Sequence, residues 1–428
     1  MSAAAEDRDY RELLARMYAA RRFGMRLELD RMVACLDRLG RPQSRFAAVA
    51  QVAGTNGKGS TAAFTESVLR AAGLRTGLYS SPHLSRLTER FRVSGEELAP
   101  AALLEADRAV ASAAGAAGIE LTFFERLTAM AVLAFAERGV EVAVLEVGLG
   151  GRLDATTAVG AGVAAVTGVA LDHQEHLGST LAEIAREKAG IFRAGQGAVV
   201  GASGEPEAVA LLCDEARRAG VAALTVVDVG AIAAVPAPLG LAGAHQPANA
   251  ACALAVIDHL AARLARPISG EERARGLASC RLPGRFEQVA SSPAIIIDGA
   301  HNPQAARAVA GALRRVAAAR RVLVLAVSSD KDAAAIAGAL AGCVDEVVVT
   351  ATAHERAMPV EELAAAALEA APGLRRAPDT AAALALARGL AGPDGLVLVA
   401  GSLFLAGEAR VILCGDRADP SPISDPLP

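Results

Sequence analysis

Short runs of apolar, mostly β-branched residues alternate with stretches rich in alanine and leucine along most of the chain. Within each run the apolar residues follow one another without polar interruptions, which is typical of strands covered on both faces. The runs predict parallel β-strands over residues 46–53, 140–145, 163–170, 294–297, 321–327, 346–350 and 396–400. With helices between them, these strands predict an α/β fold whose functional residues lie at the carboxyl ends of the strands.

The length of the chain and one interruption indicate its domain organisation. A chain of 428 residues exceeds one ordinary hydrophobic core, so two or three units are expected. Residues 281–285 place proline and glycine before a fresh series of strands and helices, which predicts a hinge there. We therefore expect one domain over residues 1–284 and another over 285–418. Residues 419–428 contain four prolines and no periodic pattern, which predicts a disordered tail.

Composition narrows the class of protein. Apolar residues form 53% of the chain and charged residues 21%, with a net charge of −4 and no long basic run. This balance argues against nucleic acid or an anionic membrane as a partner. Residues 219–244 are weakly charged but contain prolines and glycines, so no membrane span is expected. Residues 1–10 lack the apolar segment of a secretory signal, and the six cysteines form no C-x-x-C pair. We expect a cytoplasmic protein with reduced thiols that acts on small molecules.

A glycine-rich segment, residues 54–61, follows the first predicted strand and precedes a helical pattern. Glycines let backbone N–H groups turn toward an anion, the start of the helix adds partial positive charge, and Lys58 supplies a cation. The spacing departs from the common phosphate loop because Gly59 separates Lys58 from Ser60. An ordinary glycine turn is the alternative, but the lysine, the hydroxyls and the following helix favour ATP or GTP.

Glu146 directly follows an apolar strand, at the position where a carboxylate holds Mg²⁺ beside a phosphate loop. The alternative is a glutamate that caps a helix. Glycines within residues 148–151 indicate close approach of the backbone to another group, which favours the metal, and Asp154 is a further candidate for the same patch.

Residues 171–176 place Asp172, His173 and His176 after another strand. This group resembles a zinc site in isolation, but it lacks a third nitrogen or sulfur ligand at helical spacing, and oxygen ligands beside ATP suit magnesium better. A hydrogen-bonded loop histidine is the alternative for His173. Residues 80–85 follow a strand at 77–79 and offer a hydroxyl to a metal. Lys188, judged by its neighbours alone, is an exposed lysine near a helix end.

Eight segments, in order, resemble the folylpolyglutamate synthase/dihydrofolate synthase family, relatives of the Mur ligases. They are residues 54–61, 80–84, 145–154, 171–173, 187–191, 243–249, 283–287 and 298–303. Each is weak alone, but their order makes the resemblance specific. It implies an N-terminal P-loop ATPase domain like that of Mur ligases, with a parallel sheet, and a smaller Rossmann-like C-terminal domain.

The resemblance implies roles for individual residues. Phosphates of ATP would lie on the loop formed by Thr55, Asn56, Gly57, Lys58, Gly59 and Ser60. Nucleotide contacts would come from Asn249, Arg285 and Asp298. Magnesium ligands, for two ions, would be Ser81, Glu146 and His173. The pteroate portion of the substrate would contact Thr122, Phe123, Phe124, Glu125, Leu153, Asp154 and Ala155.

Lys188 matches a lysine that family members carry as a carbamate. A lysine must be neutral to react with CO₂, which requires a lowered pKa in a partly buried site. Lys58, Glu146, His173 and Lys188 are therefore the expected catalytic residues.

The function that the resemblance implies is an ATP-dependent amide ligase. It would add L-glutamate to dihydropteroate and to reduced folates through an acyl phosphate, as a monomer. A synthase for polyglutamate tails alone is one alternative, and a non-catalytic ATP switch is another. A Mur ligase for UDP-sugars is disfavoured because the roughly fifty residues before Gly54 are too few for the extra domain. His301, Ser328, Arg356 and Ser402 are left as unassigned candidates for glutamate contacts.

Overall fold

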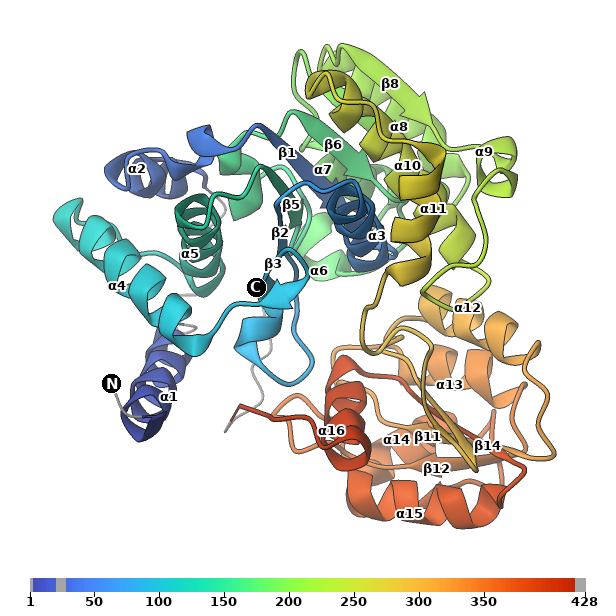
Figure 1. Ribbon diagram of the computed structural model, residues 1–428. Helices are drawn as coiled ribbons and strands as arrows, with labels where there is room; N and C mark the ends of the chain where they lie inside the picture. Colours follow the sequence, from blue (N-terminus) through green and yellow to red (C-terminus); the bar gives the residue numbers. More distant parts are fainter. Residues whose placement is uncertain (1–2, 21–27, 420–428) are drawn as a thin grey trace.

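The computed structural model describes residues 3–20 and 28–419, which form two lobes, each built around one sheet (Figure 1). The helices are α1 (Ala3–Ala20), α2 (Asp30–Arg38), α3 (Lys58–Ala71), α4 (Pro100–Ala116), α5 (Phe123–Glu137), α6 (Gln174–Leu177), α7 (Leu181–Ala189), α8 (Glu207–Arg218), α9 (Val229–Ala233), α10 (Gln246–Arg263), α11 (Gly270–Ser279), α12 (Pro303–Leu313), α13 (Ala333–Ala341), α14 (Val360–Ala367), α15 (Thr380–Ala391) and α16 (Leu403–Cys414). The strands are β1 (Ala48–Ala53), β2 (Thr76–Tyr79), β3 (Phe91–Val93), β4 (Glu96–Glu97), β5 (Val142–Glu146), β6 (Val163–Val166), β7 (Gly197–Val200), β8 (Ala223–Val226), β9 (Glu287–Ser291), β10 (Ala294–Ile297), β11 (Arg321–Leu325), β12 (Glu346–Val349), β13 (Arg375–Arg376) and β14 (Leu396–Ala400).

The first lobe contains a sheet with the order β4-β3-β2-β5-β1-β6-β7-β8. Its strands run parallel from β2 to β8 across the sheet, and only β3 and β4 add an antiparallel edge among the described residues. Helices α3, α10 and α11 cover one face, while α4, α5, α7 and α8 cover the other. Ala50 and Val52 of β1 point to the first face and Val49 points to the second. Because both faces are covered by helices, successive positions of the strand are apolar.

The second lobe contains a smaller sheet with the order β13-β12-β11-β14-β10-β9. Strands β10 to β13 and β14 are parallel, and β9 runs antiparallel to β10. Helices α12, α13 and α14 cover one face, and α15 and α16 cover the other. The α/β class and its parallel sheets therefore agree with the prediction from the apolar runs.

The predicted strand over residues 163–170 is too long, because β6 ends at Val166. Beyond it the chain turns to contact the loop after β1. The Thr167 hydroxyl donates to the Asn56 carbonyl oxygen at 2.6 Å, and the Thr55 N–H donates to the Gly168 carbonyl oxygen at 2.9 Å. Residues 167–170 are buried, which explains why this segment has small or apolar side chains although it lies outside the strand.

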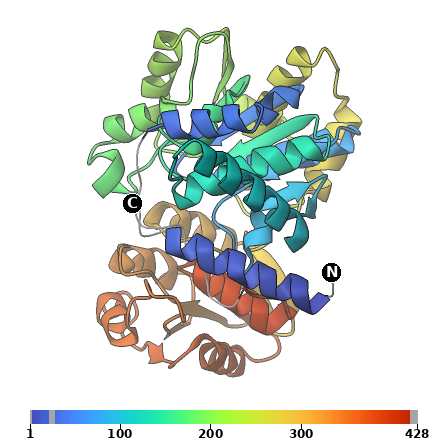
Figure 2. The same ribbon diagram turned by 90° about the vertical axis from the view of Figure 1, so that its left-hand side faces the viewer.

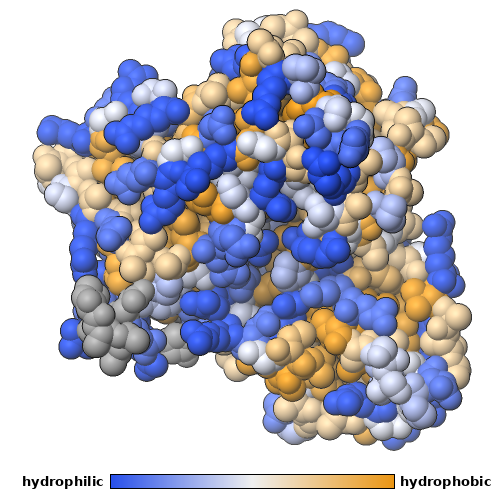
Figure 3. Space-filling view, in the orientation of Figure 1, coloured by the Kyte–Doolittle hydropathy of each residue, from blue (hydrophilic) through white to orange (hydrophobic). Residues whose placement is uncertain are grey.

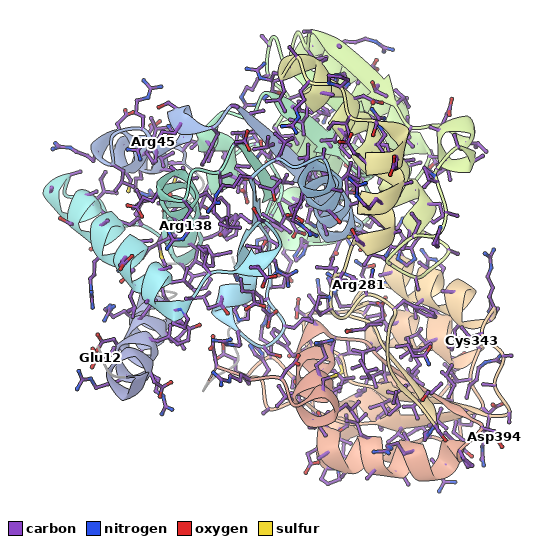
Figure 4. All side chains as sticks on the ribbon, viewed as in Figure 1. Glu12, Arg45, Arg138, Arg281, Cys343 and Asp394 are labelled. Atoms are coloured by element: carbon purple, nitrogen blue, oxygen red, sulfur yellow. The ribbon has the colours of Figure 1, made fainter. Side chains whose placement is uncertain are left out.

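The segment that follows α11 and precedes β9 connects the two lobes, and Arg281 lies at this junction in Figure 4. Figure 2 shows the second lobe below the first from a perpendicular direction. The boundary predicted at residues 284 and 285 falls in this connection, where Gly284 has a φ of 68°. The domain division itself stays a prediction.

The prediction of a disordered tail over residues 419–428 is wrong for its first residue, Asp419. Its carboxylate accepts hydrogen bonds from the Leu87 N–H at 2.8 Å and the Tyr10 hydroxyl at 3.2 Å, and its N–H donates to the Ser85 carbonyl oxygen. The side chain is buried. A polar residue in a proline-rich segment is thus fixed by contacts distant in sequence, while residues 420–428 lie outside the described residues.

Surface features add little to the functional picture. Hydrophilic and apolar side chains are interspersed on the face shown in Figure 3. In the part of the chain that the structure describes, no helix combines the length and apolar character needed to cross a membrane. Five cysteines are buried free thiols and Cys414 is exposed.

Candidate functional site

Four neighbouring strands of the first sheet, β2, β5, β1 and β6, end at one edge. Ser81 follows β2, Glu146 ends β5, residues 55–57 lie in the loop after β1, and Asp172 and His173 follow β6. These residues line a cavity of about 590 Å³ together with residues of the second lobe. The carboxyl ends of parallel strands thus bring together the candidates that the sequence separates.

The loop after β1 has room only for glycine at two positions. Gly57 has a φ of 85°, and a Cβ there would lie 2.3 Å from Asn249 Oδ1. Gly54 has a φ of 145°, and a Cβ there would lie 2.0 Å from Thr167 Oγ1. Helix α3 begins directly after this loop, at Lys58. A tight backbone at a helix N-terminus is the arrangement that binds phosphate.

Lys58 is held by the loop itself. Its ammonium donates to the carbonyl oxygens of Gly54 at 3.0 Å and Thr55 at 3.1 Å. Burial lowers its pKa, while the nearby charges of Glu146 and Asp172 oppose that shift. The cation is therefore positioned within reach of an anion bound to the loop.

The interpretation of Lys188 as an exposed lysine, made from its neighbours in the sequence, is wrong. Only 4% of the residue is exposed, and its ammonium donates to the same Gly54 carbonyl oxygen, at 3.1 Å. Burial lowers the pKa of Lys188 to about 7, with the charge of Lys58 adding to the effect and Asp172 opposing it. The side chain is buried because the end of α7 packs on Gly151, where a Cβ would lie 2.7 Å from the Lys188 carbonyl oxygen. A substantial fraction of this amine is neutral near pH 7.

Glu146 and Ser81 form a pair beside the phosphate loop. The Ser81 N–H donates to Glu146 Oε2 at 3.1 Å. A Cβ on Gly59 would lie 3.4 Å from Glu146 Oε1, so the carboxylate faces the loop. Burial raises the pKa of Glu146, and Lys58 opposes the shift. Ser81 Oγ is buried without a hydrogen-bond partner among the described residues. A carboxylate and an unpartnered hydroxyl oxygen are ligands that suit Mg²⁺.

His173 lies at the border of the same cavity, at the start of α6, with a φ of 50°. Burial lowers its pKa although Asp172 opposes the shift, so the ring is neutral and able to bind a metal. Burial tends to raise the pKa of Asp172, but His173 and Lys331 outweigh it and lower that pKa. No cluster of three or more His, Cys, Asp or Glu side chains that could hold a metal occurs within residues 3–20 and 28–419. Ser81 Oγ and bound phosphate oxygens would have to complete the ligand set.

Asn302 and Lys331 of the second lobe make polar contacts with the first lobe at this cavity, and their residue types alone did not predict them. Asn302 Nδ2 donates to Asn56 Oδ1 and to Asp172 Oδ2, each at 3.0 Å. Lys331 forms an ion pair with Asp172 at 3.0 Å. Asn302 also caps α12 through the Ala305 N–H. An Asn-Pro pair predicts such a cap, but it carries no signal for the contact across the cavity.

The predicted nucleotide residues outside the loop all line the cavity. Asn249 Oδ1 accepts from the Ser203 hydroxyl at 2.8 Å. Asp298 accepts from the N–H groups of Phe286 at 2.7 Å and Ala300 at 2.8 Å, so the first turn of the second lobe is fixed by this carboxylate. The Arg285 guanidinium donates to the Gly284 carbonyl oxygen at 3.3 Å.

The unassigned candidates of the second lobe also border this cavity. His301 follows β10, and Ser328 and Ser402 follow β11 and β14. Arg356 lies over the Phe404 ring, 5.3 Å from its centroid. The carboxyl ends of both sheets therefore contribute polar groups to one space.

Some residues of the predicted pteroate segments line the cavity and others do not. Thr122 and Phe124 line the cavity, as do Leu153 and Ala155. Phe123 does not: its side chain is fully buried in the core, where the Arg90 guanidinium lies 5.7 Å from its ring centroid, so a direct substrate contact is wrong for this residue.

The two carboxylates of these segments already have protein partners. Glu125 accepts from Arg31 at 3.1 Å and from the Thr122 N–H at 2.8 Å. Asp154 borders the cavity, but its carboxylate accepts from the N–H groups of Gly148, Leu149 and Thr156. Its role as an additional metal ligand is therefore not supported, because these contacts order the loop after β5.

Two family models match most of the chain. Residues 52–226 match the Mur ligase middle domain, and residues 284–403 match the Mur ligase glutamate ligase domain. The dihydrofolate synthase/folylpolyglutamate synthase of Escherichia coli is 41% identical over 331 residues, which cover 73% of this chain and 75% of that protein. The corresponding protein of Mycobacterium tuberculosis is 36% identical and is covered to 90%. A probable bifunctional folylpolyglutamate synthase/dihydropteroate synthase of Halobacterium salinarum is 40% identical, but the chain spans only 50% of its length.

Solved structures agree over nearly the whole chain. Mycobacterium tuberculosis folylpolyglutamate synthase complexed with ADP has a TM-score of 0.87 and 34% identity, covering 96% of this chain and 100% of that one. Escherichia coli FolC in complex with DHPP and ADP has a TM-score of 0.81 and 37% identity, with coverages of 91% and 94%. A bifunctional folylpolyglutamate synthase/dihydrofolate synthase with Mn, AMPPNP and L-glutamate bound has a TM-score of 0.81 and 35% identity, with coverages of 91% and 95%.

Proposed function

Because this chain belongs to the dihydrofolate synthase/folylpolyglutamate synthase family of Mur ligases, we propose that it is an ATP-dependent ligase for L-glutamate. The acceptors proposed are dihydropteroate and reduced folates. One observation carries the proposal: Lys58 and Lys188 both donate to the Gly54 carbonyl oxygen, beside the Ser81–Glu146 pair. Relatives solved with ADP, with DHPP and with L-glutamate support the same substrate classes.

The reaction follows from the weakness of a carboxylate as an electrophile. An oxygen of the substrate carboxylate attacks the γ-phosphorus of ATP, ADP leaves, and an acyl phosphate forms. The amine of glutamate then attacks the acyl carbon, phosphate leaves, and the amine loses a proton. Lys58 would exchange its loop carbonyl contacts for the β- and γ-phosphate oxygens and stabilise the charge that accumulates on them.

A divalent cation is part of the proposal. Ser81, Glu146 and His173 would hold magnesium, and two ions are expected. Their fit rests on the buried Ser81 Oγ that has no partner in the described chain and on the carboxylate facing Gly59. When bound, magnesium would neutralise phosphate charge and polarise the transferred phosphoryl group. The relative solved with Mn and AMPPNP supports a metal with the nucleotide.

Carbamylation of Lys188 is also proposed. The supporting observations are its burial and a pKa of about 7, which leave neutral amine available to CO₂. The carbamate would place a negative charge next to Lys58, whose ammonium donates to the same Gly54 carbonyl oxygen as Lys188. Intact mass measured at saturating bicarbonate should show the added CO₂ in the wild type and not in Lys188→Met.

The second lobe would deliver the amine. The contacts of Asn302 and Lys331 with the first lobe support closure of the lobes around the acyl phosphate. His301, Ser328, Arg356 and Ser402 line the cavity and are the proposed glutamate contacts. Closure would exclude water, which otherwise hydrolyses the activated acid.

Phosphate release tests the proposal. Purified protein is assayed with ATP, Mg²⁺ and L-glutamate, with dihydropteroate or tetrahydrofolate as acceptor, beside Lys58→Ala. Release with both acceptors supports the bifunctional ligase, and release with tetrahydrofolate alone supports a synthase for polyglutamate tails. ATP binding without release that depends on glutamate would favour a nucleotide switch instead. A monomeric state and a cytoplasmic location stay predictions, and light scattering after size exclusion checks the first.

A further inference from the structure

A chain of polar side chains connects the phosphate loop to His245. Gln246 Nε2 donates to Ser60 Oγ at 3.4 Å and lies 3.1 Å from His245 Nε2. Asn249 Nδ2 donates to Gln246 Oε1 at 3.1 Å, and Asn249 Oδ1 accepts from Ser203. Because the Gln246 amide nitrogen can only donate, His245 Nε2 accepts in this arrangement.

The other ring nitrogen of His245 has no partner. Nδ1 is buried and makes no hydrogen bond with any described residue, although the ring borders the cavity. Burial lowers the pKa of His245, while the charge of Asp298 opposes the shift and that of Arg285 adds to it, so the ring is neutral near pH 7. A neutral ring that accepts at Nε2 carries its proton on Nδ1. A buried N–H without an acceptor is costly, which indicates that a ligand supplies one.

The position of the ring indicates which part of a ligand it meets. His245 lies directly before α10, and Ala248 and Asn249 follow on the same side of the chain at helical spacing. Across the cavity, Ala305 and Ala308 of α12 line the wall. These small side chains leave space for a flat, apolar group beyond the phosphate loop. A nucleotide whose phosphates lie on that loop would place its nucleoside here.

We propose that His245 is a nucleotide-contacting residue that donates from Nδ1 to an acceptor on the nucleoside half of ATP. This inference rests on the proposed function for the nucleotide but not for the folate or glutamate. Through Gln246 the same ring is linked to Ser60, so its orientation is fixed by the loop that holds the phosphates.

Two amide substitutions separate the ring nitrogens. The amide of His245→Asn reaches the position of Nδ1, whereas that of His245→Gln reaches the position of Nε2. ADP binding in Mg²⁺ buffer is measured by calorimetry on the full chain, and thermal unfolding is recorded for each variant. We expect His245→Asn to bind within about threefold of the wild type and His245→Gln to bind about tenfold more weakly, as for one lost hydrogen bond. His245→Ala, which lacks both nitrogens, should bind like His245→Gln and serves if that variant fails to fold.

Other patterns overturn the inference. Equal affinity of the Asn and Gln variants, whether like the wild type or weaker, removes the role of Nδ1, and weaker binding by Asn than by Gln assigns the contact to Nε2. In the glutamate-dependent assay, a raised KM for ATP with little change in kcat is expected of His245→Gln, and a fall in kcat alone contradicts a binding role. If the wild type itself binds no ADP, the proposed function fails first, which distinguishes the two failures.

Discussion

Replacing Lys188 by methionine should stabilise the protein at neutral and low pH in buffer freed of CO₂. The side chain is buried, and its pKa is lowered from 10.5 to about 7. At about 1.4 kcal/mol per pKa unit, this shift corresponds to about 5 kcal/mol by which folding is opposed when the lysine is protonated. Methionine has a similar volume and no charge, so it removes that cost.

The sign of the pH dependence follows from the two pKa values. Between pH 7 and 10.5 the folded wild type has a neutral Lys188 while the unfolded chain keeps the proton, so wild-type stability rises with pH. Below pH 7 both states are protonated and the cost is constant. The advantage of Lys188→Met should therefore be largest below pH 7 and fall by about 2 kcal/mol between pH 7 and 9.

Urea unfolding of wild type and Lys188→Met at pH 6, 7, 8 and 9 measures this difference. Arg186→Met is the matched control, since that side chain lies two residues earlier on α7 and is 64% exposed. Its difference from the wild type should not change with pH. Added bicarbonate should stabilise the wild type above pH 7 and leave Lys188→Met unchanged. A Lys188→Met difference that is the same at every pH would refute the lowered pKa.

Three further substitutions test individual contacts. Gly57→Ala should weaken ADP binding at least about tenfold in calorimetry, because its Cβ would lie 2.3 Å from Asn249 Oδ1 at a φ of 85°; wild-type affinity would contradict the tight loop. Lys331→Met should cost about 3 kcal/mol in urea unfolding, since it leaves the largely buried Asp172 without its cation; unchanged stability would show a negligible ion pair. Asp419→Ala should lower the free energy of unfolding by about 2 kcal/mol, and an unchanged thermal midpoint would argue against its anchoring role.

Each apolar run corresponds to a strand, because strands buried on both faces need apolar residues at every position, but the short buried strand β7 was not predicted. The runs at β10 and β14 match the structure residue for residue. The run at β6 continues past the strand because Val169 is buried in the core beside α7 and α8, and Ala170 contacts Thr55 of the loop after β1. Apolar sequence reports burial, and it does not distinguish a sheet from a loop packed on a sheet.

The chemistry of the site was less evident from the residues. Lys188 has the local pattern of an exposed helix end, and its burial depends on Gly151 and Gly54, which lie far from it in the sequence. Asn302 and Asn56 are 246 positions apart, so their pairing is a property of the tertiary structure alone. Only the order of several weak segments, taken as a resemblance, indicated that these residues act together.

The charges at the cavity also explain why ligands should matter for stability. Glu146 is buried and Lys58 is partly buried, and the loss of solvent shifts both pKa values toward the neutral form. Lys58 is compensated by two carbonyl oxygens, which are weaker partners than phosphate oxygens. Nucleotide and metal would provide those stronger partners without any rearrangement of the sheet. Bound nucleotide and metal would therefore offset the free energy that these charges lose on desolvation. The same groups that oppose folding would favour binding.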